Sequence, residues 1–153
     1  MIEMFTDGAA QGNPGPGGYG TILRYGKHEK ELSEGFRLTT NNRMELLAVI
    51  VGLEAIKRNG IPVVVVSDSK YVVEAVEKGW IWNWEKTNFK KKANPDLWKR
   101  FIPLYHQFKP KFRWIKGHAG HLENERCDQL AVAAANGHNL KVDEGYEKPN
   151  TCP

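Results

Sequence analysis

Four acidic residues, Asp7, Glu45, Asp68 and Asp128, occupy positions where the chain is expected to enter or leave secondary-structure elements. Asp7 follows a short apolar run, and Asp68 comes directly after a run of valines. Carboxylate oxygens are the hard ligands that Mg²⁺ takes in proteins, together with water and substrate phosphates. Two such ions about 3.5–4 Å apart can hold the attacking and leaving oxygens of an in-line phosphoryl displacement. The four acids therefore predict a magnesium site that acts on phosphate.

Each acid also has a purely structural interpretation. Asp7 could end a strand in a turn, Asp68 could cap a helix, and Asp128 could offset a helix dipole in its first turn. Glu45 could complete a capping box with Asn42 as the cap. Glu45 lies in an almost continuously apolar segment, however, where a buried carboxylate needs a partner. Four such acids together favour the metal site over four separate structural roles.

The composition indicates one folded domain. The chain has 153 residues, of which 41% are hydrophobic and 26% are charged, and these values exclude a disordered polyelectrolyte. The longest apolar stretches, 48–53 and 61–66, are too short to span a membrane, and no leader-like segment opens the chain. Two cysteines, Cys127 and Cys152, form no disulfide framework. We therefore expect a cytoplasmic protein without a membrane segment.

Positive charge and tryptophan are concentrated in one part of the chain. Residues 78–116 contain eleven of the 22 Lys and Arg residues but two of the 18 acids, so this window carries +9 and the remainder −5. The same window holds all five tryptophans. A basic, aromatic-rich segment beside an acidic remainder predicts one surface that meets a polyanion and another that gathers metal.

Hydrophobic patterns predict the elements that must position the acids. The valines at 63–66 do not alternate with polar residues, which predicts a central strand that is buried on both faces and paired in parallel. Gly26-Lys27-His28 predicts a hairpin turn, Pro103 predicts a kink or break in its helix, and the tail from residue 137 is expected to be loose. The expected strands are 2–6, 19–25, 31–38, 63–66 and 112–116, and the expected helices are about 41–58, 68–78, 95–107 and 124–136. This order predicts an α/β fold with a mixed five-stranded sheet, three antiparallel strands followed by two parallel additions, and helices on both faces.

Several short motifs, in order between Ile2 and about Asn136, closely resemble type 1 ribonuclease H (ribonuclease HI) of the bacterial, single-domain type. The motifs are Thr6-Asp7-Gly8 with Gly12-Asn13-Pro14-Gly15, then Thr39-Thr40-Asn41-Asn42-Arg43-Met44-Glu45, then Ser67-Asp68-Ser69, and finally Lys116-Gly117-His118-Ala119-Gly120-His121 with Glu123-Asn124-Glu125-Arg126-Cys127-Asp128. Four such blocks in order at domain-length spacing are far more specific than any one of them.

The resemblance implies a ribonuclease H-like fold and an endonuclease that hydrolyses the RNA strand of RNA–DNA hybrids, leaving 5′-phosphate and 3′-hydroxyl ends. It implies a catalytic domain over residues 1–136 with a basic protrusion at about 80–99, followed by a polar tail at 137–153. The expected cofactor is Mg²⁺, as two ions during catalysis, with Mn²⁺ as a substitute. The expected partner is an RNA–DNA hybrid, and we expect a monomer without an N-terminal hybrid-binding domain.

The resemblance also assigns roles to residues. Asp7, Glu45, Asp68 and Asp128 become the metal ligands, and His118 becomes a catalytic helper that acts in proton shuttling or product release. Lys70 stands two positions after Asp68, where the family commonly has glutamine. The residues expected to contact substrate are Asn13, Thr40, Asn41, Asn42, Lys70, Trp82, Lys86, Lys90, Lys91 and Lys92.

Other interpretations remain open at the level of sequence. Trp80, Trp82 and Trp84 could pack in the core instead of stacking on bases. His118 and His121 with Cys127 form an incomplete zinc pattern, because a clear fourth ligand is missing. The chain could be a hybrid-binding module without activity, an integrase-like polynucleotidyl transferase or a structural domain of a polyprotein. The complete set of acids argues against the first, and the Gly-His-Ala-Gly loop argues against the second. The start at a methionine argues weakly against the third.

Overall fold

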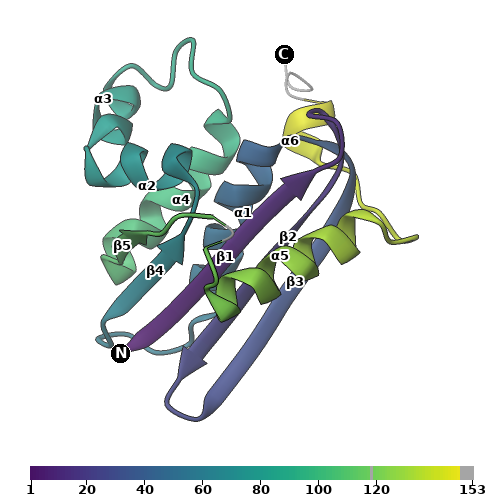
Figure 1. The fold of residues 1–153 in the computed structure, drawn as a ribbon. Coiled ribbons are helices and arrows are strands. Elements are labelled where there is room, and N and C mark those ends of the chain that lie inside the picture. The colour runs from purple at the N-terminus through teal and green to yellow at the C-terminus, as the bar shows by residue number, and fades with distance from the viewer. Residues whose placement is uncertain (118, 149–153) are drawn as a thin grey trace.

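The computed structural model describes residues 1–117 and 119–148, which form one five-stranded sheet with helices packed against it (Figure 1). The strands are β1 (Ile2–Ala10), β2 (Gly15–Tyr25), β3 (His28–Thr39), β4 (Val63–Ser67) and β5 (Lys111–Trp114). Their order is β3-β2-β1-β4-β5. β1, β2 and β3 pair antiparallel, whereas β4 pairs in parallel with both β1 and β5. The predicted mixed sheet is confirmed.

Helices cover both faces of this sheet, as predicted (Figure 1). They are α1 (Asn41–Ala55), α2 (Lys70–Glu77), α3 (Trp80–Lys86), α4 (Pro95–Phe108), α5 (Leu122–Ala135) and α6 (Glu144–Glu147). Alternate side chains of β1 serve the two faces: Met4 belongs to the main core beneath α1, and Phe5 to the smaller core beneath α5. None of the described helices is long and apolar enough to cross a membrane.

Helix α1 is buried between the sheet and α4, which explains why its sequence is apolar on almost every side. Its N-cap is Thr40, whose side chain accepts a hydrogen bond from the Arg43 N–H at 3.2 Å. The predicted capping box with Asn42 as the cap is therefore wrong. The helix also ends at Ala55 instead of about residue 58, because Ile56 turns to an extended conformation and packs against the main core.

Helix α5 lies unusually close to the sheet because glycines face it. A Cβ atom on Gly20 would lie 2.3 Å from the Cys127 carbonyl oxygen, and one on Gly18 would lie 2.5 Å from that of Ala131. The side-chain amide of Asn124 also donates to the Thr6 carbonyl at 3.2 Å. These contacts hold the start of α5 against the middle of β1, beside Asp7.

The structure differs from the local patterns at three places. β1 does not stop at Asp7 but continues to Ala10, because pairing with β2 extends to Ala10↔Gly17. Residues 80–86 form α3, a helix that the alternating tryptophans did not predict. Pro103 does not break α4, which is continuous from Pro95 to Phe108.

The segment after α5 is not loose as far as residue 148. Lys141 forms a parallel bridge with Phe36, and α6 follows it. The Asp143 carboxylate is buried and accepts hydrogen bonds from Thr39 at 2.6 Å and from Arg43 at 2.8 Å. The expectation of a loose tail was wrong here, because an isolated carboxylate in sequence gives no sign of the buried arginine that binds it.

Candidate metal centre and substrate cleft

Three of the four predicted ligands converge from three different elements. Carboxylate oxygens of Asp7, Glu45 and Asp68 all lie within 4.8 Å of one another. Asp7 lies on β1, Glu45 lies in the second turn of α1, and Asp68 follows the last residue of β4. Because β1 and β4 are parallel and paired through Phe5↔Val66, the chain beyond each pair reaches the same edge of the sheet.

Gly8 allows α1 to touch β1 at the position of Glu45. A Cβ atom on Gly8 would lie 2.4 Å from the Glu45 backbone nitrogen, so no larger residue fits there without a shift. The Gly8 N–H donates to Glu45 Oε1 at 3.0 Å and to Asp7 Oδ1 at 2.9 Å. One backbone group therefore orients two of the carboxylates.

The buried carboxylates are chemically suited to a divalent cation. Glu45 Oε2 is buried and has no hydrogen-bond donor among the described residues. The Asp7 and Glu45 carboxyl groups are close enough for a hydrogen bond when one of them is protonated. When both are ionised, neither has a proton to donate and the hydrogen bond is lost. A cation would supply the positive partner that Oε2 lacks, so these residues fit the predicted metal.

Burial and mutual repulsion shift the titration of this cluster. Burial raises the pKa of Asp7 to about 7; the charge of Asp68 and the contact with Asp128 add to the rise, while Glu45 and the Gly8 N–H oppose it. Burial raises the pKa of Glu45 well above its usual range, and the neighbouring Asp7 contributes to this shift. The metal-free cluster therefore holds protons that a bound cation would displace.

Asp68 contacts Trp114 and Gly117 and does not cap α2. The cap is Ser69, whose hydroxyl accepts a hydrogen bond from the Val72 N–H at 3.3 Å. The indole N–H of Trp114 donates to the Asp68 carbonyl oxygen at 3.0 Å. A Cβ atom on Gly117 would lie 2.6 Å from Asp68 Oδ2. The helix-cap interpretation of Asp68 is therefore wrong, and its carboxylate fills the space that the glycine leaves.

Asp128 reaches the same cleft from α5. It is half-buried and lies in the second turn of the helix, whereas the acids of the first turn are Glu123 and Glu125. The interpretation of Asp128 as a first-turn dipole partner is therefore wrong. Its carboxyl group contacts Asp7 and contributes to the raised pKa there. All four predicted acids thus border one space.

This space is an open cleft of about 360 Å³. Beside the four acids it is lined by Asn41, Asn42 and Lys70, which were predicted to contact substrate. The Asn41 side chain accepts a hydrogen bond from the Ala10 N–H at 2.5 Å, and its backbone N–H donates to Asn13 Oδ1 at 3.0 Å. The turn after β1 and the start of α1 therefore form one hydrogen-bonded edge of the cleft.

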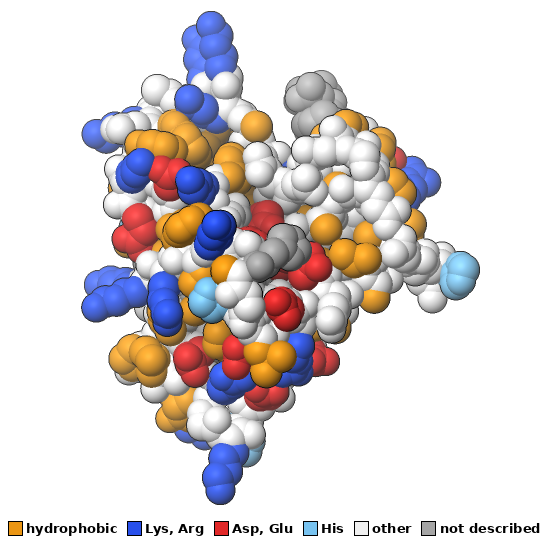
Figure 2. All heavy atoms as spheres, viewed as in Figure 1, with side chains coloured by type: hydrophobic (Ala, Val, Ile, Leu, Met, Phe, Trp, Pro, Cys, Tyr) orange, Lys and Arg blue, Asp and Glu red, His pale blue; other side chains and the backbone are white. Residues whose placement is uncertain are grey.

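The predicted basic protrusion is formed by α3 and the turns that lead to α4, at the upper left of Figure 1. The predicted lysines of this segment are exposed and do not line the cleft; they are Lys86, Lys90, Lys91 and Lys92. Figure 2 shows basic side chains along this side of the molecule, with acidic side chains nearer the middle of the same face. Trp82 instead packs on α4, with its ring 5.1 Å from Tyr105 and 5.5 Å from His106.

His118 lies outside the described residues, so its predicted role stays a prediction. The zinc interpretation fails at Cys127, which is buried and whose thiol donates to the Phe5 carbonyl at 3.2 Å. Burial raises the pKa of this thiol well above its usual range, and a zinc ligand must be a thiolate.

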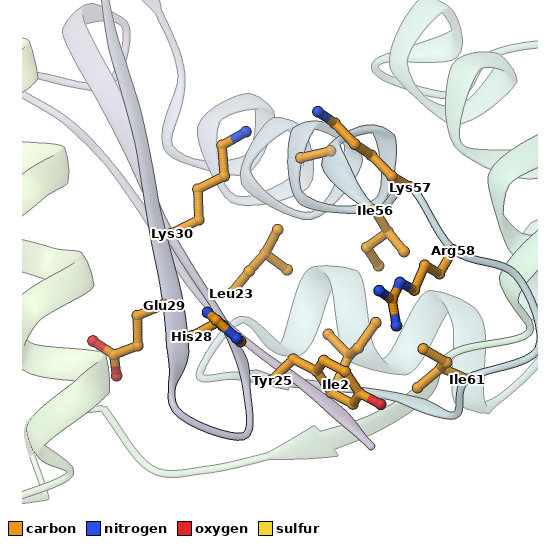
Figure 3. A pocket seen from close by; sticks show the side chains of 11 residues that line it. Ile2, Leu23, Tyr25, His28, Glu29, Lys30, Ile56, Lys57, Arg58 and Ile61 are labelled. Atoms are coloured by element: carbon orange, nitrogen blue, oxygen red, sulfur yellow. The ribbon is translucent and has the colours of Figure 1, made fainter.

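A larger hollow than the acidic cleft lies elsewhere, where the β2–β3 hairpin meets the end of α1 (Figure 3). It has about 560 Å³, and its apolar lining includes Ile2, Leu23, Ile56 and Ile61, with Lys57 and Arg58 at its edge. It contains no group of converging carboxylates. We therefore assign the candidate active site to the smaller acidic cleft, where the carboxylates converge.

Comparison with known proteins agrees with this geometry. Residues 1–136 match the model of the RNase H family. The chain is 59% identical to a ribonuclease H of Desulforamulus reducens, covering 93% of this chain and 92% of that protein, and 55% identical to one of Klebsiella pneumoniae, covering 96% of each. The chain belongs to the RNase H family. It is an enzyme of a family whose members cleave RNA in RNA/DNA hybrids.

Solved RNase H structures have the same architecture. LC9-RNase H1, described as a type 1 RNase H with the type 2 active-site motif, superposes with a TM-score of 0.79 at 31% identity, over 99% of this chain and 81% of that one. LC11-RNase H1, solved in complex with an RNA/DNA hybrid, superposes with a TM-score of 0.67 at 27% identity, over 89% and 97%. The family match ends at residue 136, so the docked α6 segment lies beyond it.

Sequence reasoning about this RNase H family enzyme missed the residues that hold the ligands. Gly8 and Gly117 both stand inside the motifs given above. Gly8 directly follows Asp7, which was an available signal of close packing, whereas Gly117 stands between Lys116 and His118 and had no neighbouring acid to mark it. Trp114 had no local signal, because its contact with Asp68 depends on the pairing of β4 with β5.

Proposed function

We propose that this enzyme is an endonuclease that hydrolyses the RNA strand of RNA–DNA hybrids, using two divalent cations held by Asp7, Glu45, Asp68 and Asp128. The products would carry 5′-phosphate and 3′-hydroxyl ends. The hybrid would be bound by a monomer in the cytoplasm, without a membrane partner. Mg²⁺ is the expected ion, and Mn²⁺ would substitute for it.

The observation that carries this proposal is the convergence of three carboxylates, within 4.8 Å of one another, around a buried oxygen of Glu45 that has no hydrogen-bond donor among the described residues. A protein core does not gather repelling charges without a compensating partner. A purely structural role for these acids would place donors around them, and only the Gly8 N–H is supplied to Asp7 and Glu45 by the described hydrogen bonds.

The chain's own residues have separable tasks in this reaction. Bound divalent cations make a water nucleophilic and relieve charge on the scissile phosphate. Glu45 and Asp7 hold their positions through the Gly8 N–H, while Trp114 and Gly117 confine Asp68. His118 would transfer a proton near the leaving oxygen or assist product release, since imidazole titrates near neutral pH.

Substrate selection would depend on the other edge of the cleft. Asn13, Asn41 and Asn42 carry amides that can both donate to and accept from the 2′-hydroxyl groups, which only the RNA strand has. Thr40 would contact a phosphate of the DNA strand. The exposed lysines Lys86, Lys90, Lys91 and Lys92 would meet backbone phosphates outside the cleft, and Trp82 would support them through its packing on α4.

The decisive experiment is cleavage of an RNA–DNA hybrid that is labelled separately on each strand, in the presence of Mg²⁺ or Mn²⁺. We expect cleavage of the RNA strand only, with no cleavage of duplex DNA or duplex RNA, and loss of activity with EDTA or in Asp7→Asn. Products that a 5′-phosphate-dependent exonuclease degrades would establish the ends.

A hybrid that binds but stays intact with every metal and pH would overturn the proposal. The chain would then be a hybrid-binding module, and its acids would be structural. Joining of strand ends instead of hydrolysis would identify a polynucleotidyl transferase.

A further inference from the structure

Lys70 lines the cleft without a salt bridge to a carboxylate of the described residues. It is the first residue of α2, it is exposed, and it lines the cleft beside Asp68. Among the described residues no carboxylate lies within ion-pair distance of its ammonium group; Glu74, one turn further along α2, pairs with Lys78 and interacts with Lys70 only at longer range. The positive charge of Lys70 is therefore available to an external anion.

Trp114 fixes where this charge lies. The Lys70 Nζ atom lies 5.2 Å from the centre of the Trp114 ring, within the range of a cation–π contact. The ring is itself fixed, because its N–H donates to the Asp68 carbonyl and its backbone pairs with Ser67 across β4 and β5. Trp114 is 43% exposed, so the indole forms a platform at the rim of the cleft and not part of the core.

The chemistry of an ammonium group limits what it can bind here. It offers three donors and no acceptor, so it suits an anionic oxygen better than a group that must both donate and accept. A glutamine at this position would provide both functions without charge. The acids within the cleft attract cations, whereas Lys70 at its rim attracts the backbone that must enter the cleft.

We propose that Lys70, held by Trp114, binds a backbone phosphate of the nucleic acid next to the metal centre and does not read base edges. This inference rests on the proposed function for the identity of the nucleic acid. Trp114 acts here as a positioning residue, because it would touch Lys70 and the Asp68 backbone and not the substrate.

The test measures binding of an RNA–DNA hybrid by fluorescence anisotropy, in the non-cleaving Asp7→Asn background with Mg²⁺, at several salt concentrations. Each phosphate contact contributes roughly 0.7–0.9 to the slope of log Kd against log salt. We expect Lys70→Gln to reduce this slope by about one contact and to raise Kd about 3- to 10-fold at low salt, with a smaller effect at high salt. Lys27→Gln, an exposed lysine at the tip of the β2–β3 hairpin, is the matched control and should change neither quantity.

An unchanged salt slope in Lys70→Gln would overturn the proposal. If the slope is unchanged but the active enzyme cuts at different sequences, Lys70 reads bases instead. If the wild type cleaves hybrids and only the slope prediction fails, the inference fails alone. If the hybrid binds with the predicted slopes but is never cleaved, the proposed function fails and the phosphate contact stands.

Trp114 is tested through its dependence on Lys70. We expect Trp114→Leu to reproduce the loss of salt slope, and to add little further loss of slope when combined with Lys70→Gln. Thermal unfolding would verify that each variant is folded. If Trp114→Leu is not, Trp114→Phe serves in the same cycle; it should lose less slope because it keeps a ring beneath Lys70, and it should still lose some because it lacks the N–H bonded to Asp68. Additive losses in the double variant would show that Trp114 does not act through Lys70.

Discussion

The Asp7 carboxyl group is buried among other carboxyl groups, and burial raises its pKa to about 7. The folded, metal-free protein holds a proton on Asp7 up to about pH 7, whereas the unfolded chain releases it near the usual value of 3.8. The folded state therefore binds more protons between these values, and its stability falls as pH rises from about 4 to about 7.

Removing this charge should stabilise the metal-free enzyme. We expect Asp7→Asn to be more stable than the wild type by roughly 1–3 kcal/mol at pH 8, and about equal to it at pH 4. Urea unfolding in the presence of a chelator would measure both values. Added Mg²⁺ should stabilise the wild type more than the variant. Lower stability of Asp7→Asn at pH 8 would contradict a repulsive cluster.

Gly117 leaves the space in which the Asp68 carboxylate lies. In Gly117→Ala the new Cβ would lie 2.6 Å from Asp68 Oδ2, so the carboxylate must move. Because that oxygen is the end of a side chain, the variant should lose less than about 1 kcal/mol of stability but about tenfold in affinity for Mn²⁺. Calorimetric titration with Mn²⁺ would measure the affinity. The control is Gly137→Ala, whose Cβ would come no closer than 3.2 Å to its neighbours; an equal loss there would exclude an effect through Asp68.

At the scale of elements, the acids of the cleft and the exposed lysines of the predicted protrusion lie on different elements. The acids are carried by β1, α1, the end of β4 and α5, whereas the exposed lysines are carried by the end of α3 and the turns between α3 and α4. These turns include four non-glycine residues with positive φ, Asn88, Phe89, Lys91 and Asn94, and Phe89 is buried. The turns are therefore anchored to the core while their lysines face solvent.

Neutralising Lys90, Lys91 and Lys92 together with glutamine should weaken substrate binding without slowing the chemical step. We expect KM to rise, its dependence on salt to flatten, and kcat to stay within about twofold, because these lysines do not line the cleft. Steady-state kinetics at several salt concentrations would measure this. Lys27, Lys30 and Lys57, changed together, form the control set. A salt dependence equal to that of the wild type would count against the protrusion as a phosphate-binding surface.

At the scale of the whole molecule, the segment after α5 ties together elements that are distant in sequence. Arg43 in α1 is 2% exposed and binds Asp143 at 2.8 Å and Asp96 of α4 at 2.7 Å. A Cβ atom on Gly145 would overlap Asp96, so α6 lies directly against this ion-pair network. The same helix α1 carries Glu45, so one helix connects the docked segment with the carboxylate cluster.

Breaking this network should destabilise the fold. We expect Asp143→Ala to cost about 2–4 kcal/mol, because it leaves part of a buried guanidinium without its partner. The matched control is Glu147→Ala. It removes a carboxylate of the same segment whose partner, Arg37, is exposed, and it should cost less than about 1 kcal/mol. Urea unfolding would compare them, and equal losses would indicate that the segment contributes as a whole and not through Arg43.

Much of the fold could be predicted from local patterns. The unalternating valines of β4, the hairpin at Gly26-Lys27 and the apolar run of α1 each report their own environment, because burial on one or both faces selects residue types position by position. The four acids could be recognised for a similar reason, because each is a charged residue in or beside an apolar segment. Residue chemistry and family resemblance predict that they belong to one site.

Other features depended on contacts between distant parts of the chain. The N-cap at Thr40, the helix at 80–86 and the docking of Asp143 on Arg43 all contradict or exceed local expectation. The sequence does not show that Trp82 packs on α4. It also does not show that Arg43 binds the carboxylate of Asp143, 100 positions later. Trp114 beside Lys70 belongs to the same class, because the pairing of β4 with β5 creates it. Residue type specifies which interactions a side chain requires, and only the assembled sheet and helices decide which partners satisfy them.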